Sequence, residues 1–140
     1  MGLENGIVVI PKSKRAKEFC EDFFSRYKEL IDFEEYKYEI CYWRKYWSLN
    51  NEILEYLDKK FDLEETKFNL TLKDLKGIVD ILKRDISYDY YENNVRCLWE
   101  YPVYARNLGN NIFELSNLID ELENEKYEEN DIKIYYYNSF

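Results

Sequence analysis

The stretch LGNNIFELSNLIDELENE, residues 108–125, decides the fold class. Its large apolar residues recur at helical spacing and form one stripe, which consists of Leu108, Ile112, Leu115, Ile119 and Leu122. A stripe of this width predicts an amphipathic helix that packs on a core. Pro102 precedes the stripe at a position suited to the first turn of a helix. A backbone N–H in that turn has no acceptor within the helix, so proline, which has no N–H, loses no hydrogen bond there.

Two short segments far apart in the chain show the pattern of strands. Residues 7–10 are four apolar residues in a row before Pro11, which predicts a strand buried on both faces. Residues 131–138 alternate Ile132, Ile134 and Tyr136 with other side chains, which is the period of a half-buried strand. We expect these two strands to pair with each other.

A further strand is predicted over residues 36–42, where one face would carry Tyr36, Tyr38, Ile40 and Tyr42. Residues 68–70 allow a short fourth strand. Helical spacing predicts three more helices, over residues 16–31, 44–61 and 71–86.

Two of these helices carry a local signal. The helix over residues 44–61 has Trp47 and Asn50 in its apolar stripe, and we interpret Asn50 as a buried amide with hydrogen-bond partners. The helix over residues 71–86 begins with Thr71 and Asp74 in the spacing of a capping box. The polar residues 87–94 predict a loop after it. Together the elements predict an α+β fold, with about four helices packed on a small, mainly antiparallel sheet of three to four short strands, in a single compact domain of residues 1–140.

The composition excludes several classes of function. The 140 residues contain no histidine, so a Ser-His-Asp triad, a Cys-His dyad and a histidine metal site are all excluded. A formal charge of -9 disfavours binding to nucleic acid or an anionic membrane. No stretch is long and apolar enough to span a bilayer. We expect no catalytic residue, no metal site and no cofactor.

The three cysteines fit neither a disulfide framework nor a metal motif, because they are odd in number and lie 21 and 56 residues apart. Cys20, Cys41 and Cys97 are therefore interpreted as small apolar residues in a reducing compartment. The sequence predicts a cytoplasmic protein, with no signal peptide at Met1 to Ile10.

The charge is concentrated in one segment. Residues 114–131 contain eight acids and one lysine, so they carry -7 of the total charge of -9. Acids near the C-terminal end of a helix oppose the helix dipole, and such a departure from a local rule is typical of a functional site. The residues predicted to bind a basic partner are Glu114, Glu121, Glu125, Glu128 and Glu129. The alternative is a solvated face that only keeps the protein soluble.

A second candidate site combines aromatic and basic residues. Trp43, Arg44, Lys45 and Trp47 could stack on a base and bind the phosphate of a nucleotide signal. The alternative is packing in the core, because no glycine-rich phosphate loop accompanies these residues.

The sequence resembles a family of small phage and prophage accessory proteins. The resemblance lies in the opening Met-Gly-Leu-Glu, where the family has Met-Gly-Leu-Asp, and in the Tyr-Trp-Arg-Lys segment at residues 42–45. It implies a phage-encoded protein of one domain that works in the host cell, and it implies no activity or catalytic residue.

Charge and resemblance together predict a non-enzymatic protein that binds and inhibits a host protein with a basic surface. The expected partner is a nucleic-acid-handling defence effector such as a CRISPR nuclease, which would make the protein an anti-CRISPR inhibitor. Direct nucleic-acid binding and membrane binding are not expected. The alternatives are a module that binds a nucleotide signal and a structural accessory protein of the phage.

Overall fold

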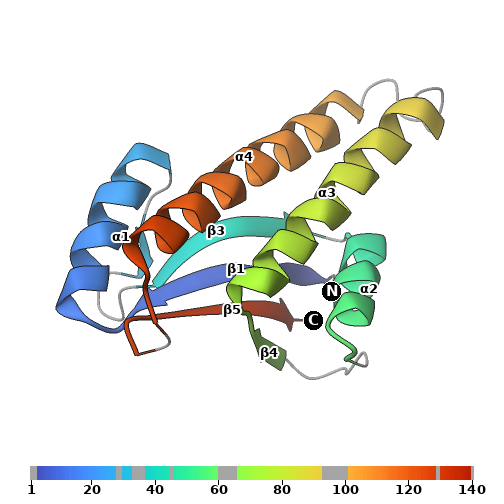
Figure 1. Ribbon diagram of the computed structural model, residues 1–140. Helices are drawn as coiled ribbons and strands as arrows, with labels where there is room; N and C mark the ends of the chain where they lie inside the picture. The colour runs from blue at the N-terminus through green and yellow to red at the C-terminus, as the bar shows by residue number, and fades with distance from the viewer. Residues whose placement is uncertain are drawn as a thin grey trace.

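The computed structural model describes most of the chain. The described residues are 3–27, 30–32, 37–44, 46–59, 66–92, 101–128 and 130–139. They form four helices and five strands (Figure 1). In chain order the elements are β1 (Glu4–Pro11), α1 (Lys14–Tyr27), β2 (Leu30–Asp32), β3 (Lys37–Arg44), α2 (Trp47–Tyr56), β4 (Thr66–Asn69), α3 (Leu72–Glu92), α4 (Tyr101–Glu125) and β5 (Ile132–Ser139).

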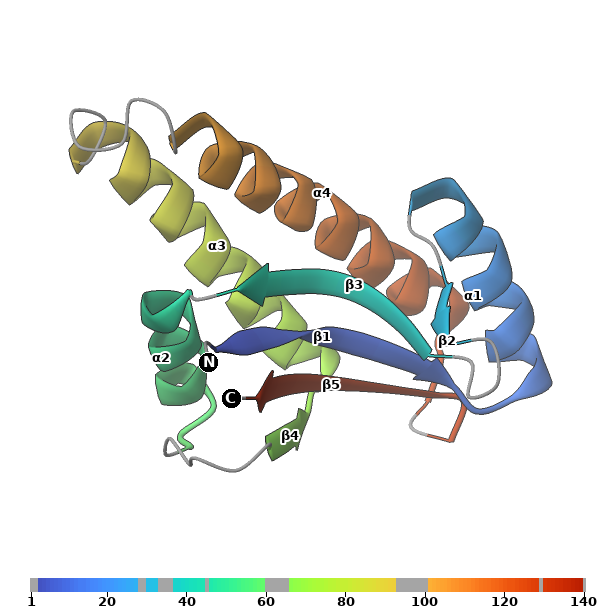
Figure 2. The ribbon, with the colours of Figure 1, turned by 180° about the vertical axis from the view of Figure 1, so that it is seen from behind.

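The five strands form one antiparallel sheet in the order β2-β3-β1-β5-β4 (Figure 2). The expected pairing of the first and last strands is confirmed, because β1 pairs with β5 along its whole length, from Glu4 opposite Ser139 to Pro11 opposite Ile132. The α+β class is therefore confirmed as well. The strand that the sequence did not predict is β2, which lies at one edge of the sheet beside β3.

Strand β1 lies in the middle of the sheet because its sequence suits burial on both faces. Ile7, Val8 and Val9 are all buried, as a continuous apolar run in a central strand requires. Its neighbour on the other side is β3, which it meets with Asn5 opposite Trp43 and Ile7 opposite Cys41.

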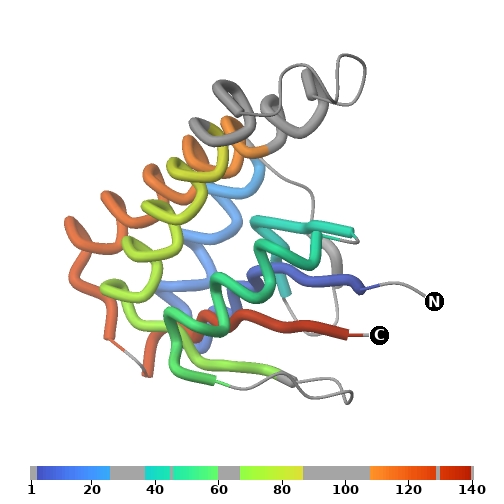
Figure 3. The backbone as a smooth tube through the Cα atoms, turned by 90° about the vertical axis from the view of Figure 1, so that its right-hand side faces the viewer, coloured from blue at the N-terminus to red at the C-terminus, as the bar shows by residue number. Residues whose placement is uncertain are grey.

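Helices α1, α3 and α4 lie on one side of the sheet, and α2 lies at the end of the sheet where both chain ends are found (Figure 3). The predicted apolar stripe of α4 is confirmed: Leu108, Leu115, Ile119 and Leu122 are buried, and Ile112 packs against the core cluster. Helices α3 and α4 run side by side and cover the sheet together. No helix in the described part of the chain combines the length and the apolar character that crossing a membrane requires.

The start of α3 confirms the capping box. The Thr71 N–H donates to Asp74 Oδ2 over 3.0 Å, and the Asp74 N–H donates to Thr71 Oγ1 over 3.1 Å. Two N–H groups that the first helical turn cannot satisfy are thereby bonded. This contact fixes the point at which the chain leaves β4 and turns into α3.

Several predicted helix limits were wrong. Helix α1 ends at Tyr27, and Leu30 to Asp32 form β2, so the predicted helix over residues 16–31 was too long. Helix α2 begins at Trp47 instead of residue 44, because Arg44 still belongs to β3. Helix α3 continues to Glu92 through part of the segment that was expected to be a loop.

A β-bulge changes which face the residues of β3 present. The register with β1 shifts between Ile7 and Val8, so one residue of β3 has no direct partner. Ile40 is buried before the shift, and Cys41 and Trp43 are buried after it. Tyr42, predicted to share a face with Ile40, is instead 47% exposed on the opposite face. Regular alternation in the sequence could not show this shift.

A cluster of buried polar side chains joins α2 to the sheet. Tyr136 O–H donates to Asn50 Oδ1, and the Asn138 amide donates to the same oxygen over 3.2 Å. The Asn5 amide donates to the Tyr136 hydroxyl oxygen over 3.0 Å. All four side chains are fully buried. The interpretation of Asn50 as a buried amide with partners is thus confirmed for its oxygen, whereas its Nδ2 has no hydrogen-bond partner among the described residues. The bonds to the oxygen orient α2 on β1 and β5.

Glycine is required at position 6 by a close approach. A Cβ atom there would meet the Cys41 carbonyl oxygen and would lie 3.0 Å from Cε1 of Tyr137. Since the obstacle on one side is backbone, it cannot move aside without breaking the pairing of β1 with β3.

We therefore expect Gly6→Ala to lower the free energy of unfolding by about 1–3 kcal/mol, as overpacking does in other cores. Urea denaturation measures this change. The matched control is Gly109→Ala in α4, where the nearest atom to a new Cβ is Ile86 Cδ1 at 4.0 Å. The control should raise stability by about 0.5–1 kcal/mol, because alanine favours a helix. Equal effects of the two substitutions would contradict the steric argument.

Candidate functional site

The C-terminal end of α4 is held by an arginine from α1. Arg15 Nη2 donates a hydrogen bond to the carbonyl oxygen of Glu125, which is the last residue of α4. Its guanidinium carbon also lies 4.3 Å from the centre of the Tyr127 ring, and Nη2 lies 4.0 Å from Glu125 Oε2. Arg15 therefore brings the positive charge that a helix C-terminus favours and that the last turn of α4 lacks.

The predicted acidic residues do not all lie on one exposed surface. Glu114 is only 9% exposed, because it lies one helical turn after Asn111 and one before Leu118, both of which are buried. The expectation that Glu114 faces a partner is corrected by this placement. Glu121 is half-buried, whereas Glu125 and Glu128 are exposed, and Glu129 lies outside the described residues.

The exposed carboxylates of the segment gather at the end of α4 and in the turn after it. We call this group the acidic surface, and it consists of Asp120, Glu123, Glu125 and Glu128. Glu123 pairs with Lys76 of α3, and Glu125 pairs with Arg15 of α1. Part of the charge is therefore used to hold α4 to its neighbouring helices.

The turn between α4 and β5 is built by Asp131. Its Oδ2 accepts from the Glu128 N–H over 3.2 Å, and its carbonyl oxygen accepts from the N–H of Lys12 over 2.6 Å. The pKa of the Asp131 carboxyl is lowered mainly by the Glu128 N–H and next by the Ser13 hydroxyl. The carboxylate thus stays ionised and keeps Glu128 at the rim of the turn.

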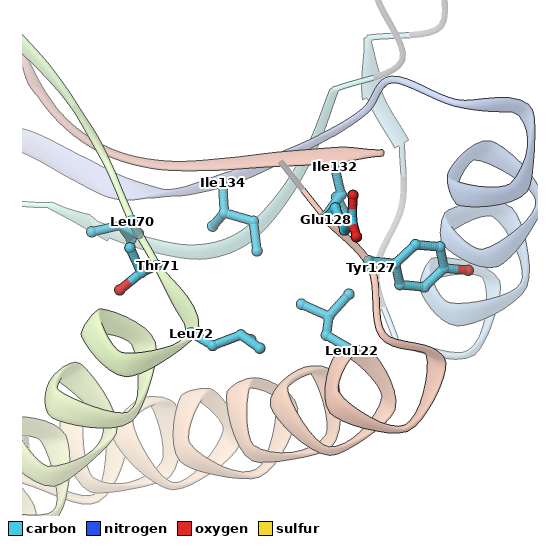
Figure 4. A pocket seen from close by; sticks show the side chains of 8 residues that line it. All are labelled: Leu70, Thr71, Leu72, Leu122, Tyr127, Glu128, Ile132 and Ile134. Atoms are coloured by element: carbon cyan, nitrogen blue, oxygen red, sulfur yellow. The ribbon is translucent and has the colours of Figure 1, made fainter. Parts of the chain in front are cut away.

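An apolar pocket of about 400 Å³ opens beside the acidic surface (Figure 4). It lies where the chain passes from β4 into α3, between the start of β5 and the last turns of α4. The lining residues are Leu70, Thr71, Leu72, Leu122, Tyr127, Glu128, Ile132 and Ile134. Leu72, Leu122 and Ile134 point toward its centre, and Glu128 stands on one side (Figure 4). The pocket combines apolar walls with a carboxylate that already belongs to the acidic surface.

Trp43, Arg44 and Trp47, the described residues of the aromatic and basic segment, do not line one common pocket. Trp43 is 5% exposed and packs in the core, while the adjacent Arg44 is exposed on the opposite face of β3. Trp47 at the start of α2 is 44% exposed, although the sequence placed it in an apolar stripe. Lys45 lies outside the described residues. The alternative of core packing thus describes Trp43 but not Trp47.

The described cysteines are not suited to nucleophilic chemistry. Cys20 and Cys41 are both buried, as expected, and neither is in a disulfide; Cys97 lies outside the described residues. Burial raises the pKa of the Cys20 thiol to about 12, so it is protonated at neutral pH. Within the described ranges, no group of three or more cysteine, aspartate or glutamate side chains could hold a metal ion.

Two carboxyl groups meet between α2 and α3. Burial, followed by a hydrogen bond with Asp85 and the charge of Asp85, raises the pKa of Glu52 to about 7. The Tyr46 hydroxyl donates to Asp85 Oδ2 over 3.1 Å, on the same side of the interface. Neither acid was singled out in the sequence as one of a pair, because only the packing of α2 on α3 brings them together.

Sequence reasoning also missed the pocket and Arg15. The apolar pocket residues have the pattern of ordinary core residues, and nothing in that pattern shows that they leave space. Arg15 lies in a short basic segment, and its signal would have been the shortage of cations in the last turn of α4. Comparison with known protein families, with curated proteins and with solved structures finds no match for the chain.

The carboxyl pair predicts a dependence of stability on pH. Since the pKa of Glu52 is raised from 4.5 to about 7, the folded state binds a proton in this range that the unfolded chain releases. Stability should therefore fall as the pH rises through this window. We expect Glu52→Gln to lose part of this dependence when urea denaturation at pH 5 is compared with pH 8. The control Glu18→Gln, on α1, should keep it; an unaltered pH dependence in Glu52→Gln would refute the assignment.

Proposed function

We propose that the protein is a non-catalytic interaction protein that binds a basic surface of a protein partner through the end of α4 and the turn after it. The observation that carries the proposal is the set of exposed carboxylates beside an apolar pocket at this end of the molecule. Protein interfaces of this kind combine an apolar centre with a charged rim.

The local charge supports a basic partner. Residues 120–131 contain seven acids and one base, Lys126, and among the described residues Arg15 pairs with Glu125 and Lys76 pairs with Glu123. The segment itself thus carries a net charge of -6. A surface with this excess attracts a basic partner, speeds its association and repels nucleic acid.

The nature of the partner follows from the resemblance and stays a prediction. Proteins that hold nucleic acid carry basic surfaces, so an acidic protein can compete for the same surface. This supports the proposal that a phage-encoded protein of this kind binds and inhibits a nucleic-acid-handling defence effector of the host. The nucleotide-binding alternative has less support, because Trp43 and Arg44 face opposite sides of β3.

The proposal predicts that Glu125→Gln combined with Glu128→Gln weakens binding to a basic probe. Octalysine serves as the probe, and its affinity is measured by NMR titration at low and at moderate salt. We expect a loss of about threefold to tenfold at low salt and a weaker dependence on salt, because two of the attracting charges are removed.

The matched control removes the same charge at the other end of the molecule, with Glu55→Gln and Asp58→Asn at the end of α2 (Figure 1). It should change the affinity less than twofold. If the two double variants lose affinity equally, the binding depends on net charge alone and the proposed surface is wrong. Capture from a host lysate with the wild-type protein and both variants then identifies partners that depend on Glu125 and Glu128.

A further inference from the structure

Charged side chains of both signs lie around the pocket beside Glu128. A second hollow of about 270 Å³ adjoins it, and the two share Leu70, Thr71, Ile132 and Ile134 as lining residues. The second hollow is also lined by Lys12, Lys133 and Asn69, and both lysines are exposed. Glu128 therefore lies at the rim of the first pocket, and the two lysines lie at the rim of the adjoining hollow.

The size of the pocket suits a large apolar side chain. A volume of about 400 Å³ lies within the roughly 300–1,000 Å³ that pockets for bound groups occupy. Its walls are the aliphatic side chains of Leu70, Leu72, Leu122 and Ile134. The Thr71 hydroxyl oxygen already accepts a hydrogen bond from the Asp74 N–H. The walls therefore favour an aliphatic or aromatic group over a polar one.

Strand β5 is open beside the same pocket. Its pairing with β4 runs only from Asn138, opposite Thr66, to Tyr135, opposite Asn69. The Leu70 N–H then donates to the Ile134 carbonyl oxygen over 2.8 Å, after which the chain turns into α3. Among the described residues, the start of β5 is thus paired with β1 alone. The edge that a short extended segment of another protein would contact therefore consists of Ile132 and Lys133.

We propose that the pocket binds one large apolar side chain of the protein partner, in an extended segment whose neighbouring residue on the Glu128 side is lysine or arginine. This inference rests on the proposed function and deepens it. It specifies a short sequence pattern in the partner, a basic residue beside a large apolar one, that the acidic surface and the pocket would bind together.

Four capped tetrapeptides test the proposal on the unaltered protein. They differ only in the central pair, which is Lys–Phe, Gln–Phe, Lys–Ala or Gln–Ala, and dissociation constants are measured by NMR titration. We expect the Lys–Phe peptide to bind about tenfold more tightly than the Lys–Ala peptide, because the phenylalanine ring is buried. We expect it to bind about threefold more tightly than the Gln–Phe peptide.

Two variants locate the effect. Glu128→Gln should reduce the affinity for the Lys–Phe peptide to that for the Gln–Phe peptide, whereas Glu55→Gln should leave it unchanged. Leu72→Trp places a larger side chain in the pocket and should remove the advantage of phenylalanine over alanine. If Leu72→Trp does not fold, the comparison of peptides on the unaltered protein still decides.

Each other outcome overturns a defined part. Equal, salt-dependent binding of the Lys–Phe and Lys–Ala peptides would overturn the pocket and leave the acidic surface in place. Equal binding of the Lys–Phe and Gln–Phe peptides would overturn the role of Glu128 in this inference, whereas the octalysine comparison decides the proposed electrostatic function. Preferential binding of dodecanoate would show that the occupant is a fatty acid, and no binding of any peptide at millimolar concentration would overturn the site.

Discussion

The pairing of β1 with both β3 and β5 is the constraint on which the rest of the structure depends. In the described sheet, β1 lies between β2 and β3 on one side and β5 and β4 on the other, so the strands of the two sides are positioned relative to each other through it. Because β1 is buried on both faces, other elements must pack on each face of the sheet. Helices α1, α3 and α4 pack on one of the two faces. Gly6 lets the β3 backbone and the Tyr137 ring approach β1 at the same residue. A side chain there would disturb both halves of the sheet at once.

The parts of the fold that the sequence predicted are those with a regular repeat or a local hydrogen bond. The stripe of α4, the paired strands β1 and β5 and the capping box at Thr71 each follow from a spacing within one element. The outward orientation of Tyr42 depends on a bulge in the pairing with β1, which no periodicity within β3 reveals. Secondary structure was thus predictable where it is regular, and its irregularities arise from contacts between strands.

The candidate site was predictable in charge but not in shape. Counting acids locates the end of α4, yet the burial of Glu114 and the ion pairs of Glu123 and Glu125 follow from how α4 packs. The pocket is formed by residues from β4 to α3, from α4 and from β5, and each of these segments alone has the pattern of ordinary core. The space exists only because these segments pack together, so the pattern of any one segment does not predict the pocket.

The pairing of β1 with β5 has a consequence for how the protein folds during its synthesis. β1 is synthesised before its partner β5, which is more than 120 residues away in the chain. Contacts over such a separation form slowly, because a long loop must close before any of them is gained. Until residue 139 is available, Ile7, Val8 and Val9 have one sheet neighbour instead of two. While the residues between β1 and β5 are being synthesised, one edge of this apolar strand therefore lacks its partner, and an unpaired edge of this kind is prone to aggregation.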